Sequence, residues 1–166
     1  MSIEQLLSKH WSDVRRIYEE GIASGNATFQ VKAPAWEQWD NAHVSNVRLV
    51  AVEYEKIIGW SAVSLVSSRP VYSGVGEVSV YVDPIAQGRG VGKFLLKELI
   101  QHSEQNGFWT LQAGIFPENI ASLKIHQNLG FIILGTREKI GKMGNTWRNT
   151  ILLERRSTII GIKEEN

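Results

Sequence analysis

Residues 87–92 read Gln-Gly-Arg-Gly-Val-Gly and lie between an expected strand at residues 77–82 and an expected helix that begins near Lys93. The start of a helix exposes unpaired backbone N–H groups and the positive end of the helix dipole. Glycine lets an anion approach those N–H groups because it has no Cβ atom. The spacing Q-x-x-G-x-G therefore predicts a phosphate-binding turn. Its residues are Gln87, Gly88, Arg89, Gly90, Val91, Gly92 and Lys93.

Other glycine-rich turns fit this stretch less well. A Walker loop requires a glycine five residues before its Gly-Lys pair and Ser or Thr after it, but Gln87 and Phe94 occupy those places. A dinucleotide fingerprint requires G-x-G-x-x-G, whereas this chain has G-x-G-x-G followed by Lys93. The remaining alternative is a turn that needs small residues and binds nothing, since short motifs often match by chance.

The order of the expected elements around this turn indicates a mixed α/β (α+β) fold. Helical spacing of Val14, Ile17, Tyr18 and Ile22 predicts a first helix capped by Ser12. The strand, helix and strand over residues 77–115 imply a right-handed parallel crossover. The short connection between the first two β-rich runs predicts an antiparallel hairpin. Helices are expected at residues 12–22, 36–43, 90–106 and 120–128, and strands at 49–53, 57–67, 77–82, 110–115, 131–139 and 147–154.

Composition limits the classes of function. The 166 residues are 43% hydrophobic and carry a formal charge of +1. This length fits one domain over residues 1–166, with a tail from about residue 155 for which no packing signal is visible. Because Lys and Arg are scattered among Asp and Glu, neither nucleic acid nor an anionic membrane is the expected partner. The tail and the aromatic residues leave a homodimer as the expected assembly.

Two absences in the sequence narrow the chemistry further. The chain has no cysteine, which excludes disulfides, thiolate metal sites and a cysteinyl acyl-enzyme. Its four histidines show no H-E-x-x-H spacing, so no metal is expected. Without an apolar run of membrane length or a signal segment, the expected location is cytoplasmic.

Several further stretches extend the pattern of the glycine turn. The sequence resembles the GCN5-related N-acetyltransferases (GNAT), and among them the phosphinothricin and methionine sulfoximine N-acetyltransferases, over about residues 13–154. The similar stretches are Ile17–Ile22, Ala27–Phe29, Glu77–Pro84, Asn119–Gln127, Leu129–Phe131 and Trp147. The resemblance implies the GNAT fold, a mixed central sheet in which two parallel strands splay apart. It also implies acetyl-CoA as co-substrate, with the glycine turn on its pyrophosphate.

The resemblance assigns the pantetheine arm to the gap between the splayed strands. There the backbone groups of Val80, Tyr81 and Val82 lack ladder partners, and pantetheine amides would satisfy them. Asn119 and Ser122 match positions beside the pantetheine. For Asn119 the alternative is a plain helix N-cap, and both roles are compatible.

Two residues match the catalytic positions of the resembling enzymes. An amine acceptor with a pKa of about 8 or above must lose a proton before it attacks a thioester. Glu77 is similar to the glutamate that serves as base, directly or through water, although charged residues also begin strands without any role. His126 stands where most of the superfamily has tyrosine. It either donates a proton to the leaving thiolate, orients the ligand, or is structural.

Acceptor recognition is assigned by the same resemblance to Phe29, Arg69, Tyr72 and Glu77. An arginine holds a carboxylate or phosphinate with two hydrogen bonds, whereas the alternative for Arg69 is plain surface placement. The function expected is N-acetylation of a small amino acid or an amino-acid-like inhibitor such as phosphinothricin, methionine sulfoximine or methionine sulfone. Alternatives are another acceptor, such as a polyamine, an aminoglycoside or a peptide N-terminus, or a non-catalytic acyl-CoA sensor.

Overall fold

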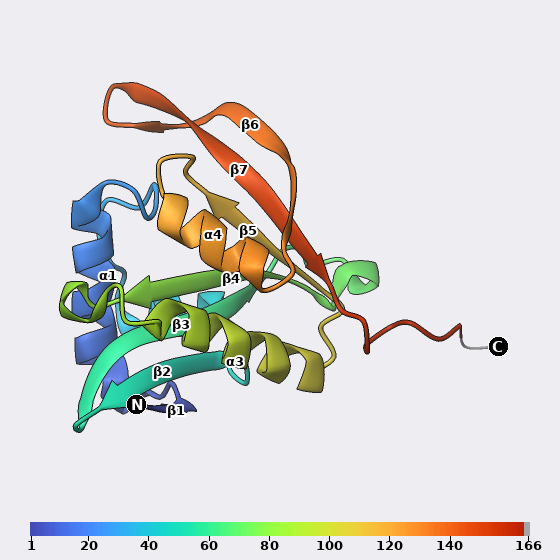
Figure 1. Cartoon of the computed structure of the whole chain (residues 1–166), viewed down its shortest axis with the longest axis horizontal. Helices are drawn as coiled ribbons and strands as arrows, with labels where there is room; N and C mark the ends of the chain where they lie inside the picture. Colours follow the sequence, from blue (N-terminus) through green and yellow to red (C-terminus); the bar gives the residue numbers. More distant parts are fainter. Residues whose placement is uncertain (165–166) are drawn as a thin grey trace.

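The computed structural model describes residues 1–164 and contains a seven-stranded sheet in the order β1-β2-β3-β4-β5-β7-β6 (Figure 1). Among the strands of residues 1–164, only β4 and β5 pair in parallel. The predicted mixed sheet with a parallel centre is therefore confirmed. The strands are β1 (Ser2–Gln5), β2 (Arg48–Glu53), β3 (Lys56–Leu65), β4 (Val75–Val82), β5 (Thr110–Ile115), β6 (Ile132–Met143) and β7 (Thr146–Arg156). The helices are α1 (Trp11–Ser24), α2 (Trp36–Ala42), α3 (Val91–Gln105) and α4 (Ile120–Asn128), with 3-10 turns at Ser8–His10, Pro70–Tyr72 and Pro84–Ala86.

Helices cover both faces of the sheet, so its central strands are buried on both sides. Leu95 and Leu99 of α3 pack in one apolar cluster, and Ile17 of α1 packs in another with Trp39 of α2. Strand β3 divides its side chains between the two clusters and reads as a nearly continuous apolar run for that reason. Each fully buried leucine or isoleucine contributes about 1.5–3 kcal/mol relative to its exposed state.

Four details differ from the expectations. Strand β1 has no alternating apolar pattern and forms only by pairing with β2. Helix α1 begins at Trp11 with His10 as its N-cap, so Ser12 is not the cap. Strand β6 continues to Met143 because β7 pairs with it that far. Helical spacing predicts that Phe94, Leu95, Leu99 and His102 share one face of the helix at residues 90–106, but the buried face of α3 is formed by Leu95, Leu96, Leu99, Ile100 and Ser103, and Phe94 and His102 are only half-buried.

The two central parallel strands separate after three paired positions. The ladder joins Val75 to Thr110, Gly76 to Leu111, and Glu77 to Gln112, and pairing ends there. On its other side β4 stays paired to β3 as far as Val82 opposite Gly59. The segment from residue 78 to residue 82 thus presents one unpaired backbone edge toward β5, as the resemblance implied.

The chain after β7 is held by polar contacts that the sequence did not predict. The hydroxyl of Ser157 donates to Oε1 of Glu104 at 2.9 Å, and the guanidinium of Arg156 donates to the carbonyls of Ile160 and Gly161. The C-terminal segment then runs away from the sheet (Figure 1). Within residues 1–164, no helix combines the length and apolarity needed to span a bilayer.

Candidate active site

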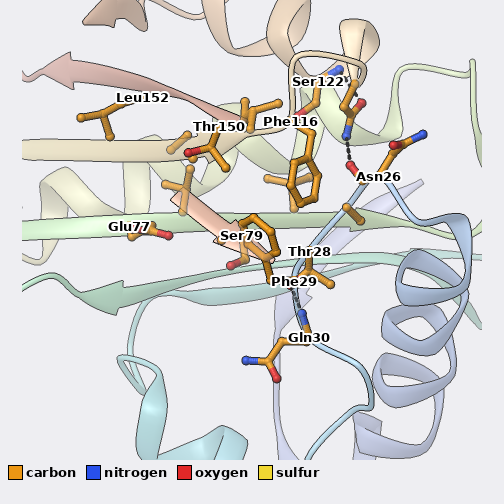
Figure 2. A pocket seen from close by; sticks show the side chains of 18 of the residues that line it. Asn26, Thr28, Phe29, Gln30, Glu77, Ser79, Phe116, Ser122, Thr150 and Leu152 are labelled. Atoms are coloured by element: carbon orange, nitrogen blue, oxygen red, sulfur yellow. Dashed lines mark hydrogen bonds between the residues drawn. The ribbon is translucent and has the colours of Figure 1, made fainter. Parts of the chain in front are cut away.

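A cleft of about 550 Å³ opens where β4 and β5 diverge (Figure 2). Its walls are the open edge of β4, the end of β5, the first turns of α4, the β6–β7 hairpin and the segment after α1 at residues 26–31. Seven residues predicted for catalysis or binding line this cleft, although they are far apart in the sequence. They are Phe29, Glu77, Val80, Tyr81, Asn119, Ser122 and His126.

Glu77 occupies the last paired position of the parallel ladder, at the mouth of the gap. Its Oε2 accepts a hydrogen bond of 2.8 Å from Nε2 of Gln112, the residue opposite it on β5. The carboxylate is exposed and lines the cleft, and its second oxygen has no side-chain partner among the described residues. This geometry suits a general base, because one oxygen fixes the orientation while the other stays accessible to a water or an amine.

His126 is buried on α4 beside the cleft, with its ring 5.0 Å from that of Phe131. Its Nδ1 lies 2.7 Å from the carbonyl oxygen of Ser122. Since a carbonyl only accepts, Nδ1 carries the proton and Nε2 of the neutral ring carries the lone pair. Burial lowers the pKa of His126, which disfavours the imidazolium form. The neutral ring is thus suited to accept a hydrogen bond at Nε2 rather than to donate a proton.

Asn119 caps α4 and also contacts the segment after α1, whereas its contact with the pantetheine stays a prediction. Its Oδ1 accepts from the backbone N–H of Ser122 at 3.3 Å, which caps α4. Its Nδ2 donates to the carbonyl of Asn26 at 3.2 Å. Asn119 therefore joins the start of α4 to the segment after α1.

Arg148 of β7 stabilises the same corner and was not predicted. Its Nη2 donates to Oδ1 of Asn26 at 2.9 Å and to Oε2 of Glu118 at 3.1 Å. Its guanidinium carbon lies 3.7 Å from the centre of the Phe116 ring. A further hydrogen bond runs from Nη1 to the carbonyl of Gly25. One side chain thus connects three walls of the cleft. A backbone hydrogen bond, and after it the hydrogen bond from Arg148, lower the pKa of the Glu118 carboxyl.

Aromatic rings form the upper part of the cleft and its floor. The rings of Phe29 and Phe116 meet edge to face at 4.9 Å, and Figure 2 shows them side by side. Tyr81, which also lines the cleft, stacks on Trp60 at 4.6 Å, and burial raises the pKa of Tyr81 far above its usual value. Four tryptophans that are dispersed in the sequence converge in this core, namely Trp11, Trp36, Trp39 and Trp60.

The structure does not bring Arg69 and Tyr72 into this cleft. Both are exposed in the connection before β4, with the guanidinium of Arg69 5.5 Å from the Tyr72 ring. Their part in acceptor binding remains a prediction without support from the geometry of this chain.

The glycine turn lies beside the outer end of β4 and not in the wall of the cleft. Gly88 and Gly90 have φ values of +74° and +81°, which favour glycine. Helix α3 starts directly after Gly90, and no side chain caps it. A Cβ on Gly92 would lie 3.4 Å from Cγ2 of Val82, which puts this helix start next to the open strand edge. The turn therefore fits a pyrophosphate group, with uncapped N–H groups and no Cβ in the way.

The charged side chains of the turn differ in their surroundings. Arg89 makes two hydrogen bonds to Glu53 of β2, at 2.8 and 2.6 Å. Gln87 and Lys93 are exposed. Asp83 fixes the approach to the turn, because its Oδ1 accepts from the N–H of Ile85 at 3.1 Å and its Oδ2 pairs with Arg16 at 2.6 Å. The exposed Lys93 and the backbone N–H groups of the helix start therefore remain as anion donors, whereas Arg89 already has a carboxylate partner.

Sequence reasoning missed several lining residues, and no motif marks them. Asn26 and Gln30 flank the similar stretch Ala27–Phe29, while Arg137, Ile140 and Thr150 lie on the hairpin. Among the described residues, no group of His, Cys, Asp or Glu is arranged to hold a metal ion.

Known proteins similar in sequence to this chain are acetyltransferases. Residues 9–131 match the model of the acetyltransferase (GNAT) family. The chain is 30% identical over 149 residues to a phosphinothricin N-acetyltransferase of Alcaligenes faecalis, covering 86% of this chain and 75% of that protein. It is also 30% identical over 106 residues to an L-methionine sulfoximine/L-methionine sulfone acetyltransferase of Salmonella typhimurium, covering 64% and 62%.

A solved structure supports the fold. A phosphinothricin acetyltransferase from Sinorhizobium meliloti, crystallised with acetyl-CoA, superposes with a TM-score of 0.89 at 24% identity over 99% of this chain and 92% of that one. The open β4 edge and the uncapped turn offer backbone groups that can bind an amide-bearing arm and a phosphate group. With its family match over residues 9–131, the chain belongs to the acetyltransferase (GNAT) family and is an acetyl-CoA-dependent N-acetyltransferase.

Proposed function

We propose that this enzyme transfers the acetyl group of acetyl-CoA directly to the amino group of a small L-amino acid or an amino-acid-like inhibitor. Phosphinothricin, methionine sulfoximine and methionine sulfone are the acceptors to test, because the relatives named above act on such compounds. The observation that carries the proposal is the position of Glu77, in the cleft and at the last paired rung of the splayed strands.

The residues of the cleft and of the glycine turn have separate roles in this reaction. When bound, acetyl-CoA supplies an activated acetyl thioester. Backbone groups of Val80 and Tyr81 hold the pantetheine arm, and the turn at residues 87–93 holds the pyrophosphate. Glu77 takes the proton of the acceptor amine, directly or through a water. His126 accepts a hydrogen bond at Nε2 and orients the ligand, since its pKa is lowered by burial.

The acceptor lies between the aromatic corner of Phe29 and Phe116 and the carboxylate of Glu77. The absence of cysteine makes direct transfer the simplest route, because no cysteinyl acyl-enzyme can form. A cleft of about 550 Å³ favours a small acceptor over a protein substrate. A homodimer remains the proposed assembly.

A thiol-release assay tests the proposal. Wild-type enzyme with acetyl-CoA should release CoA when given an amino acid of this class, and mass spectrometry should find the N-acetyl product. Polyamines, aminoglycosides and a peptide with a free N-terminus form the comparison panel. Turnover only with these other amines would overturn the proposed acceptor class. Acetyl-CoA binding without turnover of any amine would favour the acyl-CoA sensor.

A further inference from the structure

Arg137 and Glu77 are the charged side chains, apart from the histidine, among the described residues that line the cleft. Glu77 is negative, Arg137 is positive, and burial lowers the pKa of His126 toward a neutral ring. An arginine keeps its charge at every physiological pH. The cleft therefore offers one anionic end and one cationic end, a pattern that complements an acceptor with an amino group at one end and an anion at the other.

The guanidinium of Arg137 is available for such an anion. Other arginines of the chain form ion pairs, such as Arg89 with Glu53 and Arg148 with Glu118. Within residues 1–164, Arg137 forms no ion pair. No side-chain hydrogen bond to Arg137 occurs in that range either. Arg137 is exposed and lines the cleft, so a ligand would meet a guanidinium without a competing carboxylate.

A bulge in β6 places the Arg137 side chain in the lining of the cleft. Arg137 pairs with Thr150 and Gly141 pairs with Arg148, so three residues of β6 face the single residue Asn149 of β7. The bulge is held by the N–H of Lys139, which donates to Oδ1 of Asn149 at 2.8 Å. In a regular strand, positions 137 and 140 would point to opposite faces, yet both line the cleft here.

The sheet register separates the two charges. Glu77 pairs with Gln112, Gln112 pairs with Glu154 of β7, and Arg137 pairs with Thr150. The four residues from Glu154 to Thr150 span roughly 13 Å along β7, and neighbouring strands lie about 4.8 Å apart. Glu77 on β4 and Arg137 on β6 are therefore separated both along the strands and across the sheet. The α-carboxylate of an amino acid is adjacent to its amino group. With the amine at Glu77, the group that reaches Arg137 is the far end of the acceptor side chain.

We propose that Arg137 is a specificity-determining residue that binds an anionic group at the far end of the acceptor side chain, such as a phosphinate or γ-carboxylate. The proposal rests on the proposed function and narrows it, because it separates phosphinothricin from its neutral analogues. Arginine suits this role since its fork binds both oxygens of a phosphinate or carboxylate.

Two acceptors isolate this interaction. L-Phosphinothricin and L-methionine sulfone have the same backbone and nearly the same side-chain shape, but the phosphinate is charged and the sulfone is neutral. The measured quantity is the ratio of kcat/KM for phosphinothricin to kcat/KM for methionine sulfone. Wild type should give a ratio above one. Arg137→Gln should lower the ratio about tenfold to hundredfold, since a hydrogen bond to a charged group is lost. The ratio for Arg137→Lys should lie between the ratios for wild type and Arg137→Gln.

Two further variants test whether a change in the kcat/KM ratio is specific to Arg137. Lys142→Ala removes a positive charge from the same strand, outside the cleft, and should leave the ratio as in wild type. Arg69→Ala tests the alternative clamp predicted from the sequence. An unchanged ratio in Arg137→Gln, or a ratio that falls only in Arg69→Ala, would overturn the role of Arg137.

Failure of the proposed function has a separate signature. If wild type acetylates neither compound, the acceptor class is wrong, and the role of Arg137 is then decided by calorimetric binding of the same two compounds to the CoA-saturated enzyme. Weaker binding of phosphinothricin by Arg137→Gln than by wild type, with unchanged binding of acetyl-CoA, would still support it. Equal binding would overturn it.

Discussion

The ring of Phe29 lies directly over Gly141 of β6, so that a Cβ built on Gly141 would be only 2.8 Å from Cζ of Phe29. The contact seats the segment after α1 against the hairpin and sets the width of the cleft at its aromatic corner. The absence of a side chain at position 141 is what permits this approach.

Gly141→Ala should therefore displace the Phe29 ring and weaken acceptor binding. Overpacking typically costs about 1–3 kcal/mol of stability, and where about 1.4 kcal/mol of this strain falls on acceptor binding, kcat/KM for the acceptor falls roughly tenfold. The KM for acetyl-CoA should change little. Gly135→Ala is the control, because it adds the same methyl group to β6 where nothing lies within 4 Å. Equal acceptor kinetics in the two variants would show that the Phe29 contact does not shape the site.

Gly90→Val and Gly92→Val should weaken acetyl-CoA binding. A β-branched residue at the positive φ of Gly90 is strained by about 1–2 kcal/mol, and in either position it covers N–H groups of the helix start. Calorimetry measures the affinity. Gly107→Val is the control, since Gly107 has a φ of +84° after the opposite end of α3. Loss of affinity in all three variants alike would point to unfolding instead of a cofactor turn.

Arg148→Ala should loosen the corner that joins the cleft walls. Losing its hydrogen bonds to Asn26 and Glu118 should lower the free energy of unfolding by about 2 kcal/mol. Amide hydrogen exchange should accelerate in residues 26–31. Arg15→Ala serves as comparison, because its exposed pair with Glu19 contributes about 0–1 kcal/mol. Similar effects of both substitutions would remove Arg148 from this positioning role.

His126 should make the fold sensitive to acid. Burial holds the pKa of His126 below its usual value of 6.5, so the unfolded chain takes up the proton at a higher pH than the folded chain. The contribution of the neutral His126 ring to the free energy of unfolding is fully present above pH 6.5 and is lost as the pH falls through the lowered pKa. Urea titrations at several pH values check this. The decline toward acid should be shallower in His126→Gln, in which His10 and His43 are unchanged, and parallel declines would contradict a buried neutral ring.

The sequence predicts the local elements well where their signals are strong. The strand at Thr110–Ile115 and the helix at Ile120–Asn128 agree with the expected bounds, because apolar spacing and an Asn cap delimit them. Strand β1 was missed because four residues with one half-buried side chain carry no pattern. Its existence depends on the exposed edge of β2, which is a tertiary property.

The candidate site was predictable only in part, for a related reason. Motifs identified Glu77, His126 and Asn119, and the splayed strands bring them together. Arg137 and Arg148 belong to no motif, and their direction depends on the register and bulge of the β6–β7 hairpin. Conversely, Arg69 was assigned by resemblance, but the connection that holds it leaves it outside the cleft.

The central claim is that Glu77 is the general base, and the variant Glu77→Gln tests it most directly. Glutamine keeps the shape and a hydrogen-bonding partner for Gln112 but removes the basic oxygen. The measurement is kcat/KM against pH for both proteins, with one amino-acid acceptor and saturating acetyl-CoA. Near neutral pH, we expect a loss of about 10²–10⁴-fold. The loss should shrink as pH rises, because more of the acceptor is then already a neutral amine. Parallel profiles with a loss under about threefold would contradict the account.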